Sequence, residues 1–278
     1  MEARHFIGYR PAAMTSAPPV GRYLREWRQR RRMSQLDLAC EAEISTKHLS
    51  FLETGRALPS RAMVLHLAER LEVPLRDRNV LLSAAGYAPV FPERPLDDPA
   101  LRAARQAIDL VLAGHEPYPA LAVDRHWTLV AANAATHRLL AGLDAALLQP
   151  PVNVLRLGLH PAGLAPRTAN LPEWRAHLLA RLRRQIEITA DPVLVALLRE
   201  LQAYPAGRAA PGKPGAALDY GGVIVPFQLV SEAGILSFLS TTTIFGTPVD
   251  VTLAELALEA FYPADAATAE ALRRLAAE

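Results

Sequence analysis

The stretch Ser34-Gln-Leu-Asp-Leu-Ala-Cys-Glu-Ala-Glu-Ile-Ser-Thr-Lys-His-Leu-Ser-Phe-Leu-Glu-Thr-Gly55 decides the fold of the first third of this chain. Ser34 is followed three residues later by Asp37, an approximate capping box that predicts the start of a helix. Ser45 is a second N-cap residue, and the helix that it opens is expected to end at Gly55, because glycine tolerates the left-handed conformation. Two short helices joined by a tight turn are therefore predicted.

Helical signals continue on both sides of this stretch. Before it, Val20, Leu24 and Trp27 recur at the spacing of one helix face. After it, Pro59-Ser60 opens a fourth helix, and residues 74–85 predict a fifth that ends at Gly86. We therefore expect a five-helix, all-α domain over residues 20–88, preceded by a flexible tail over residues 1–19.

The third helix has two different faces. On a helical wheel, Leu49 and Leu52 lie on one side, whereas Thr46, Lys47, Ser50 and Thr54 lie on the other. Short hydroxyl side chains around one lysine suit the major groove of duplex DNA, where they can approach base edges. The alternatives are that Ser50 and Thr54 face solvent with no partner, and that Lys47 contacts a phosphate rather than a base.

The residues from Ser34-Gln35-Leu36 to Ala39 and from Ser45 to Gly55 resemble the XRE family of helix-turn-helix repressors. The resemblance implies that Gln35 binds a backbone phosphate and that the helix after Ser45 lies in the major groove. Arg56 and Arg61 would then contact phosphates. The expected DNA-binding residues are Gln35, Ser45, Thr46, Lys47, Ser50, Thr54, Arg56 and Arg61.

Composition agrees with a DNA-binding first part. Residues 1–90 carry 14 basic against 9 acidic residues, whereas residues 91–278 carry 16 against 19. A basic surface suits a polyanion, because neutralising phosphates releases counterions. The single cysteine, Cys40, implies no intrachain disulfide, and no apolar run reaches the length of a membrane span, so a cytoplasmic protein without a membrane partner is expected.

A different kind of domain is predicted after a proline-rich linker at residues 89–100. Residues 101–112 have helical spacing, and residues 120–132 predict a hairpin that leads into a helix capped by Asn133. Helices are expected between residues 134 and 203. Three further strands are predicted at residues 223–230, 235–245 and 253–262, followed by a C-terminal helix.

This order, two strands, several helices and three strands, is that of a PAS-like domain, in which an antiparallel sheet and a helical side enclose a pocket. The stretches at residues 117–121, 124–127, 160–163, 240–257 and 261–265 resemble the MmyB-like transcription regulators. The fold class is therefore α+β, with an XRE-type domain followed by a PAS-like domain over residues 101–278. The resemblance implies an elongated, fatty-acid-like ligand, although Ala132 departs from the aromatic residue more usual there.

A ligand pocket needs apolar walls and a few polar anchors. The sheet residues Ile224, Phe227, Leu236 and Phe238, facing helix residues such as Trp174, could line such a pocket or simply form a core. Candidate anchors for a carboxylate are basic residues or histidines on the helices. The expected ligand-binding residues are Arg138, His160, Trp174, Arg175, Phe227, Leu236 and Phe238, and Arg183 is a further candidate anchor.

Enzyme and metal chemistry find no support in the sequence. It contains no HExxH motif, GxSxG elbow, Walker A loop or dinucleotide fingerprint, so no catalytic residue, metal site or resident cofactor is predicted. We expect a homodimeric regulator that binds double-stranded DNA and a small apolar ligand. The alternatives are an enzyme with an appended DNA-binding domain, and a second domain that serves only for dimerisation.

Overall fold

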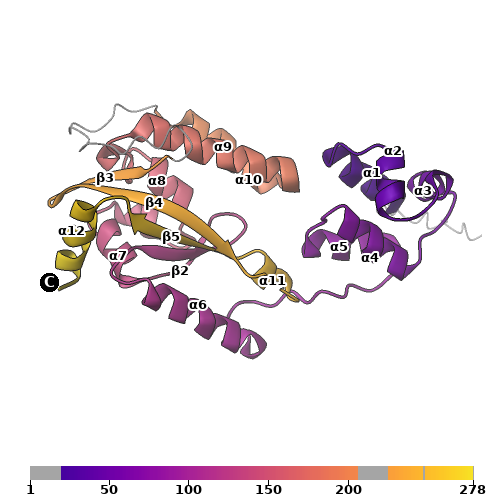
Figure 1. The fold of residues 1–278 in the computed structure, drawn as a ribbon, viewed down its shortest axis with the longest axis horizontal. Coiled ribbons are helices and arrows are strands. Elements are labelled where there is room, and N and C mark those ends of the chain that lie inside the picture. Colours follow the sequence, from indigo (N-terminus) through magenta and orange to yellow (C-terminus); the bar gives the residue numbers. More distant parts are fainter. Residues whose placement is uncertain (1–19, 206–224, 247, 278) are drawn as a thin grey trace, which may run out of the picture. The chain divides into compact units, whose positions relative to one another are not determined.

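The computed structural model describes residues 20–205, 225–246 and 248–277. The chain divides into two compact units between Val90 and Phe91 (Figure 1). No helix in the described ranges is both long enough and apolar enough to cross a membrane.

The first unit is the predicted bundle of five helices. They are α1 (Val20–Arg30), α2 (Gln35–Glu41), α3 (Thr46–Glu53), α4 (Arg61–Arg70) and α5 (Leu75–Ala84). Ser34, Ser45 and Ser60 cap α2, α3 and α4, each accepting a hydrogen bond from a backbone N–H of the first turn, and Ser34 forms the full capping box with Asp37. The capping signals of the sequence are thus confirmed.

The core of this unit is made of leucines from all five helices and one tryptophan. Leu24, Leu38, Leu49, Leu52, Leu67, Leu71, Leu81, Leu82 and Trp27 are all buried. Helices α1 and α3 approach closely at Gly21, where a Cβ atom would lie only 2.2 Å from the backbone oxygen of Leu52. A residue without a side chain therefore lets these two helices meet.

The second unit is built on a five-stranded antiparallel sheet with strand order β2-β1-β5-β4-β3. Its strands are β1 (Ala120–Val123), β2 (Leu129–Ala132), β3 (Phe227–Ser231), β4 (Gly234–Ile244) and β5 (Ala257–Pro263). The helices are α6 (Arg102–Gly114), α7 (Ala134–Leu140), α8 (Val154–Leu159), α9 (Leu171–Thr189), α10 (Pro192–Ala203), α11 (Val251–Ala254) and α12 (Ala266–Ala277). Short 3₁₀ helices lie at Pro99–Leu101, Ala145–Leu148 and Ala165–Arg167.

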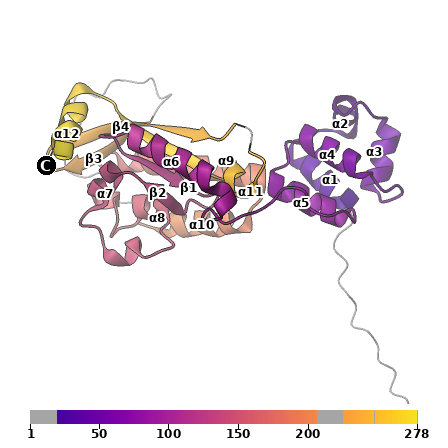
Figure 2. The same cartoon turned by 90° about the horizontal axis from the view of Figure 1, so that it is seen from below.

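The two faces of the sheet are covered by different helices. Helix α6 lies across one face, where Ile108 and Leu112 pack against Ala122 and Leu258 (Figure 2). Helices α9 and α10 lie on the opposite side, and their leucines join the larger core of the unit (Figure 1). Successive residues of β1 and β5 point to opposite faces, so both strands contribute to both layers. The predicted α+β architecture with a helical face is confirmed.

Two of the predicted strands have other limits in the structure. Residues 253–256 do not belong to the last strand, because Asp250 caps the short helix α11 by accepting a hydrogen bond from the N–H of Thr252, and β5 begins only at Ala257. Strand β3 begins at Phe227 rather than at residue 223. Ile224, predicted on the same sheet face, lies outside the described residues.

Much of the proline-rich segment at residues 89–100 is tied to the second unit. Arg94 forms an ion pair of 3.0 Å with the buried carboxylate of Asp250, and its carbonyl accepts a hydrogen bond from the hydroxyl of Thr252. The N–H of Val251 donates to the carbonyl of Pro92. Leu96 of the same segment packs against the cluster that contains Ile108 and Leu112, so an apolar contact adds to these polar ones.

A network of polar side chains joins α8 to α10. Arg156 donates two hydrogen bonds to the Glu200 carboxylate, at 2.8 and 2.7 Å, and the Tyr204 hydroxyl donates to the same group at 2.6 Å. The hydrogen bond from Arg156 is the main cause that lowers the pKa of Glu200. Burial and the hydrogen bond to Glu200 raise the pKa of Tyr204 to about 12.

We expect the second unit to lose stability in acid through Glu200. A carboxyl with a lowered folded pKa stabilises the fold above its ordinary pKa of 4.5, and this contribution disappears as the pH falls through the folded value. Denaturant unfolding measured from pH 7 to pH 3 should show the decline. Glu200→Gln should flatten it, and an unchanged slope in that variant would contradict a role for this carboxylate.

Candidate functional sites

The first candidate site is the exposed face of α3. Leu49 and Leu52 are fully buried and hold the helix against the bundle, whereas Thr46 and Lys47 are exposed. Ser45 is also exposed, but its hydroxyl oxygen accepts a hydrogen bond from the N–H of His48 at 3.1 Å. The predicted division of α3 into a buried and a polar face is therefore present.

Phe51 lies between two cations on this surface. The ammonium of Lys47 is 5.7 Å from the centre of its ring, and the guanidinium of Arg56 is 5.9 Å from it. Such distances allow cation–π attraction, which holds both positive charges near the ring. The Thr54 hydroxyl donates to the carbonyl of Ser50 at 2.7 Å, so its hydrogen is used within the helix and only its oxygen is left to accept.

Gln35 is held in place by a buried ion pair. Arg28 and Glu53 are both 8% exposed and form two hydrogen bonds, of 2.6 and 2.9 Å. Arg28 also donates to the carbonyl of Met33, which lies in the turn before α2. The Gln35 amide donates to Glu53 at 2.8 Å, so the first residue of α2 is fixed relative to α1 and α3.

Arg61 completes the predicted set. It is the first residue of α4, directly after the cap Ser60, and it is exposed. Together, Gln35 and Arg61 place polar or basic groups at the N-terminal ends of α2 and α4, where backbone N–H groups favour anions.

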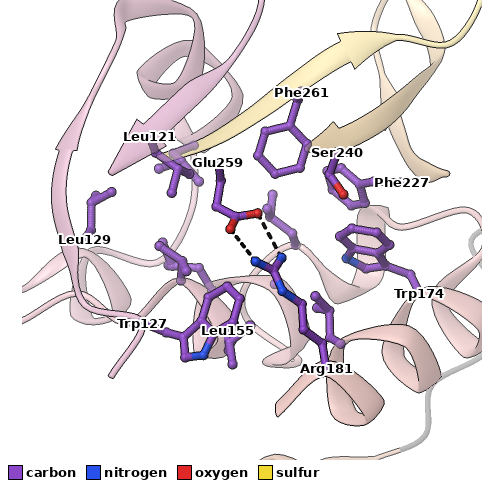
Figure 3. Close-up of a pocket in the computed structure, with 16 residues that line it drawn as sticks. Leu121, Trp127, Leu129, Leu155, Trp174, Arg181, Phe227, Ser240, Glu259 and Phe261 are labelled. Carbon is purple, nitrogen blue, oxygen red and sulfur yellow. Dashed lines mark hydrogen bonds and ion pairs between the residues drawn. The ribbon is translucent and has the colours of Figure 1, made fainter. Parts of the chain in front are cut away.

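The second candidate site is a cavity of about 100 Å³ between the sheet and the helices of the second unit (Figure 3). A smaller cavity of about 70 Å³ shares Leu121, Leu140, Leu164, Phe227 and Phe261 with it. The walls of the larger cavity are mostly aliphatic and aromatic. Its lining consists of Leu121, Trp127, Leu129, Leu140, Val154, Leu155, Leu157, Gly158, Leu164, Trp174, Leu178, Arg181, Phe227, Ser240, Glu259 and Phe261.

A single ion pair stands in this apolar wall. Arg181 of α9 binds the carboxylate of Glu259 of β5 through two hydrogen bonds, of 2.9 and 2.5 Å (Figure 3). The Thr242 hydroxyl bridges the two groups, at 2.6 Å from Arg181 and 3.0 Å from Glu259. The Glu259 side chain is only 5% exposed, and that of Arg181 is 27% exposed. The pair thus joins the helical side to the sheet across the cavity.

Trp127 carries the guanidinium of Arg181 on its ring, at 4.5 Å from the ring centre. Its backbone has a φ of +66°, a left-handed conformation that is uncommon for a bulky residue and costs of the order of 1–3 kcal/mol. Its indole N–H donates to Gln185 of α9 at 2.8 Å. The turn between β1 and β2 is therefore fixed so that this ring faces the cavity.

His177 lies next to this site on α9. Its ring stacks on Trp174 with centres 5.3 Å apart. Burial, followed by the positive charge of Arg181, lowers the pKa of His177, so the neutral form is favoured. No cluster of three or more potential metal ligands exists in the described part of the chain.

Comparison with known proteins gives these two sites a family context. The family model of the MmyB-like transcription regulator ligand binding domain matches residues 104–275, and a helix-turn-helix domain model matches residues 19–81. The first match alone covers more than half of the chain. The chain belongs to the MmyB-like transcription regulators.

One curated protein and one solved structure are similar to this MmyB-like regulator, with partial coverage in the first case and low identity in the second. It is 38% identical over 76 residues to the uncharacterized HTH-type transcriptional regulator RghRB of Bacillus subtilis (strain 168), across 27% of this chain and 52% of that protein. The chain thus spans about half the length of this relative. An RNA-binding light-oxygen-voltage receptor aligns over 92% of this chain and 63% of its own, with 14% identity and a TM-score of 0.24, too low to support an argument.

In this MmyB-like regulator, only part of the predicted ligand set meets at the cavities. Trp174 and Phe227 line the larger cavity, and Phe238 lines the smaller one. Leu236 is buried in the surrounding core but lines neither cavity. The three aromatic rings form one cluster, with Phe227 5.0 Å from Trp174 and 6.0 Å from Phe238.

The predicted polar anchors lie elsewhere. Arg175 donates to four carbonyls at the end of α10, so its guanidinium is used as a helix cap. His160 accepts a hydrogen bond from the N–H of Ala162 and packs edge-on against Tyr204. Arg138 lies 3.8 Å from Glu116 on a separate surface depression, and Arg183 is exposed on α9.

Trp127, Arg181 and Glu259 line the larger cavity but are not among the residues predicted from the sequence. In strand β5, Glu259 points to the face opposite that of Leu258. That second face is covered by α9, so Glu259 is buried and needs a cation. Helix α9 contains four arginines that could pair with Glu259. Only the packing of α9 on the sheet brings Arg181 to this carboxylate.

Proposed function

We propose that this protein is a ligand-responsive transcription regulator that binds double-stranded DNA as a homodimer through α3. The observation that supports DNA binding is the geometry of α3: fully buried leucines anchor one side, while Thr46, Lys47 and the oxygen of Thr54 are exposed on the other. In helix-turn-helix proteins, the second helix reads bases through a polar face that is held in the major groove. Gln35, Arg56 and Arg61 are proposed phosphate contacts on the flanking segments.

The second unit is proposed to bind a small apolar ligand, fatty-acid-like in shape, in the cavity between α9 and the sheet. Apolar walls with a few placed polar groups are typical of ligand sites. Ligand binding would change the spacing or freedom of the two DNA-reading helices of the dimer, and operator DNA would then change ligand affinity by the same factor. We propose a cytoplasmic location and no catalytic activity for such a regulator.

Selection of bound genomic fragments, combined with native mass spectrometry of gently purified protein, tests both parts. The first measurement identifies an operator, and the second reports a dimer and any copurified apolar molecule. Copurified lipid would support sensing. A protein that selects no DNA sequence would contradict the regulator, and an empty cavity that takes no apolar probe would favour a purely dimerising second unit.

Lys47→Ala should weaken binding to the selected operator by about 1–3 kcal/mol if Lys47 bonds a base edge. If it contacts only a phosphate, affinity should fall similarly for all sequences and the salt dependence should decrease by about one charge. Gel shifts at two salt concentrations distinguish these results. Arg183→Ala, which removes an exposed cation from the second unit, is the control. Unchanged affinity and selectivity in Lys47→Ala would remove Lys47 from the interface.

A further inference from the structure

The polar groups in the lining of the larger cavity bear on the charge of any ligand that could bind there. Two charged side chains line it, Arg181 and Glu259, and they neutralise each other through the two hydrogen bonds described above. Thr242 adds a further hydrogen bond to each. The cavity therefore carries no net charge from its described lining, and its one guanidinium already faces a carboxylate.

A ligand carboxylate would meet an unfavourable environment here. To bind Arg181 it would have to displace Glu259, leaving that 4%-exposed residue without its cation. To enter without displacing Glu259 it would place a second anion beside the first in an apolar surrounding. Both routes disfavour an anionic group inside the cavity.

Two uncharged hydrogen-bonding groups stand in the lining beside the ion pair. The hydroxyl of Ser240 and the indole N–H of Trp174 have no hydrogen-bond partner among the described residues, and Trp174 is only 5% exposed. Figure 3 shows both side chains in the cavity wall beside Phe227. A buried N–H without a partner is costly, and an oxygen acceptor on a ligand would satisfy it.

We propose that this cavity selects an uncharged ligand, whose apolar chain fills the space and whose neutral oxygen bonds with Ser240 or Trp174. The inference rests on the proposed ligand-binding function and specifies its ligand class as alcohols, esters or similar neutral amphiphiles rather than carboxylate anions. The Arg181–Glu259 pair selects against carboxylate ligands, because the guanidinium of Arg181 is already bound to the carboxylate of Glu259.

Calorimetric titration of the full-length protein with octan-1-ol and with sodium octanoate at pH 7.5 tests this. These probes have the same chain length and differ in the charge of the polar end. Wild-type protein should bind octanol at least about tenfold more tightly, because octanoate must break the ion pair or stay at the mouth. In Glu259→Gln, where Arg181 is left without an anion, the ratio should shift toward octanoate by about tenfold or more.

The matched control is Glu173→Gln, which removes a carboxylate from an exposed position of α9 and should leave the ratio unchanged. Ser240→Ala, a small change that keeps the ion pair, should weaken octanol binding about three- to tenfold, with little effect on octanoate. If Glu259→Gln does not fold, Ser240→Ala and the ratio of octanol to octanoate affinity in the wild-type protein still test the proposal.

The outcomes separate the two proposals. Octanoate binding to wild type as tightly as octanol, or a folded Glu259→Gln with an unchanged ratio, would overturn charge selection and leave the ligand-binding function standing. Octanol binding that Ser240→Ala and Trp174→Phe both leave intact would overturn the neutral-oxygen contact. If wild-type protein binds neither probe, the ligand-binding function itself fails, and the selectivity inference fails with it.

Discussion

Glu53→Ala is expected to destabilise the first unit by about 3–5 kcal/mol, because it leaves the guanidinium of Arg28 buried without its anion. The Glu53 side chain is 2% exposed and that of Arg28 is 10% exposed, so water cannot replace the lost partner. Hydrogen exchange followed by mass spectrometry measures this in the full chain, through the opening free energy of amides in α1 and α3.

A double variant separates stability from positioning. In Arg28→Met with Glu53→Leu, both charges are replaced by apolar side chains, and stability should return to within about 1–2 kcal/mol of wild type. Gln35 would then lack the oxygen to which it donates, so operator binding should stay weaker than in wild type. Full recovery of operator affinity in the double variant would show that the ion pair does not position Gln35.

Phe238→Ala is expected to destabilise the second unit by about 3–5 kcal/mol. The ring is fully buried, lines the smaller cavity, and packs against Phe227 and Phe261 with centres 6.0 and 6.3 Å away. Its removal joins a new void to the existing one, and the walls lose contacts that no other group supplies. Thermal unfolding followed by circular dichroism measures the loss.

Tyr262→Ala is the control for this change, since Tyr262 is an aromatic residue of the neighbouring strand with 45% exposure. It should cost less than about 1 kcal/mol. The enlarged cavity of Phe238→Ala should also bind octan-1-ol more tightly than wild type does, because an apolar void accepts apolar guests. A loss below about 1 kcal/mol would mean that the cavity collapses around the missing ring.

Local sequence signals accounted for most of the secondary structure. The caps Ser34, Ser45 and Asn133 open helices as predicted, because each accepts a hydrogen bond from the backbone N–H three positions along the chain. The limits of β5 were predicted less well, since the cap of α11 at Asp250 starts a short helix where the first residues of the strand, 253–256, were expected. The ends of helices and strands can therefore be predicted from the sequence wherever a capping signal and a strand pattern do not overlap.

Of the two candidate sites, the polar face of α3 could be predicted from the sequence and the polar groups of the cavity could not. The polar face of α3 follows from helical periodicity alone, and the structure leaves it exposed. The cavity does not follow from periodicity, because its polar element joins Arg181 and Glu259, which are 78 positions apart. Arg175, predicted as an anchor from the same helix, points to the end of α10 instead.

The amino-acid sequence by itself determined the five-helix first unit, the order of strands and helices in the second, and the two-faced α3, since these depend on turns, caps and spacing within a few residues. Only the tertiary structure decided which arginine of α9 enters the cavity, that Glu259 is buried beside it, and that Gly21 stands where α1 touches α3. The physical reason is that burial and ion pairing depend on which elements pack together, and no local pattern records the partner.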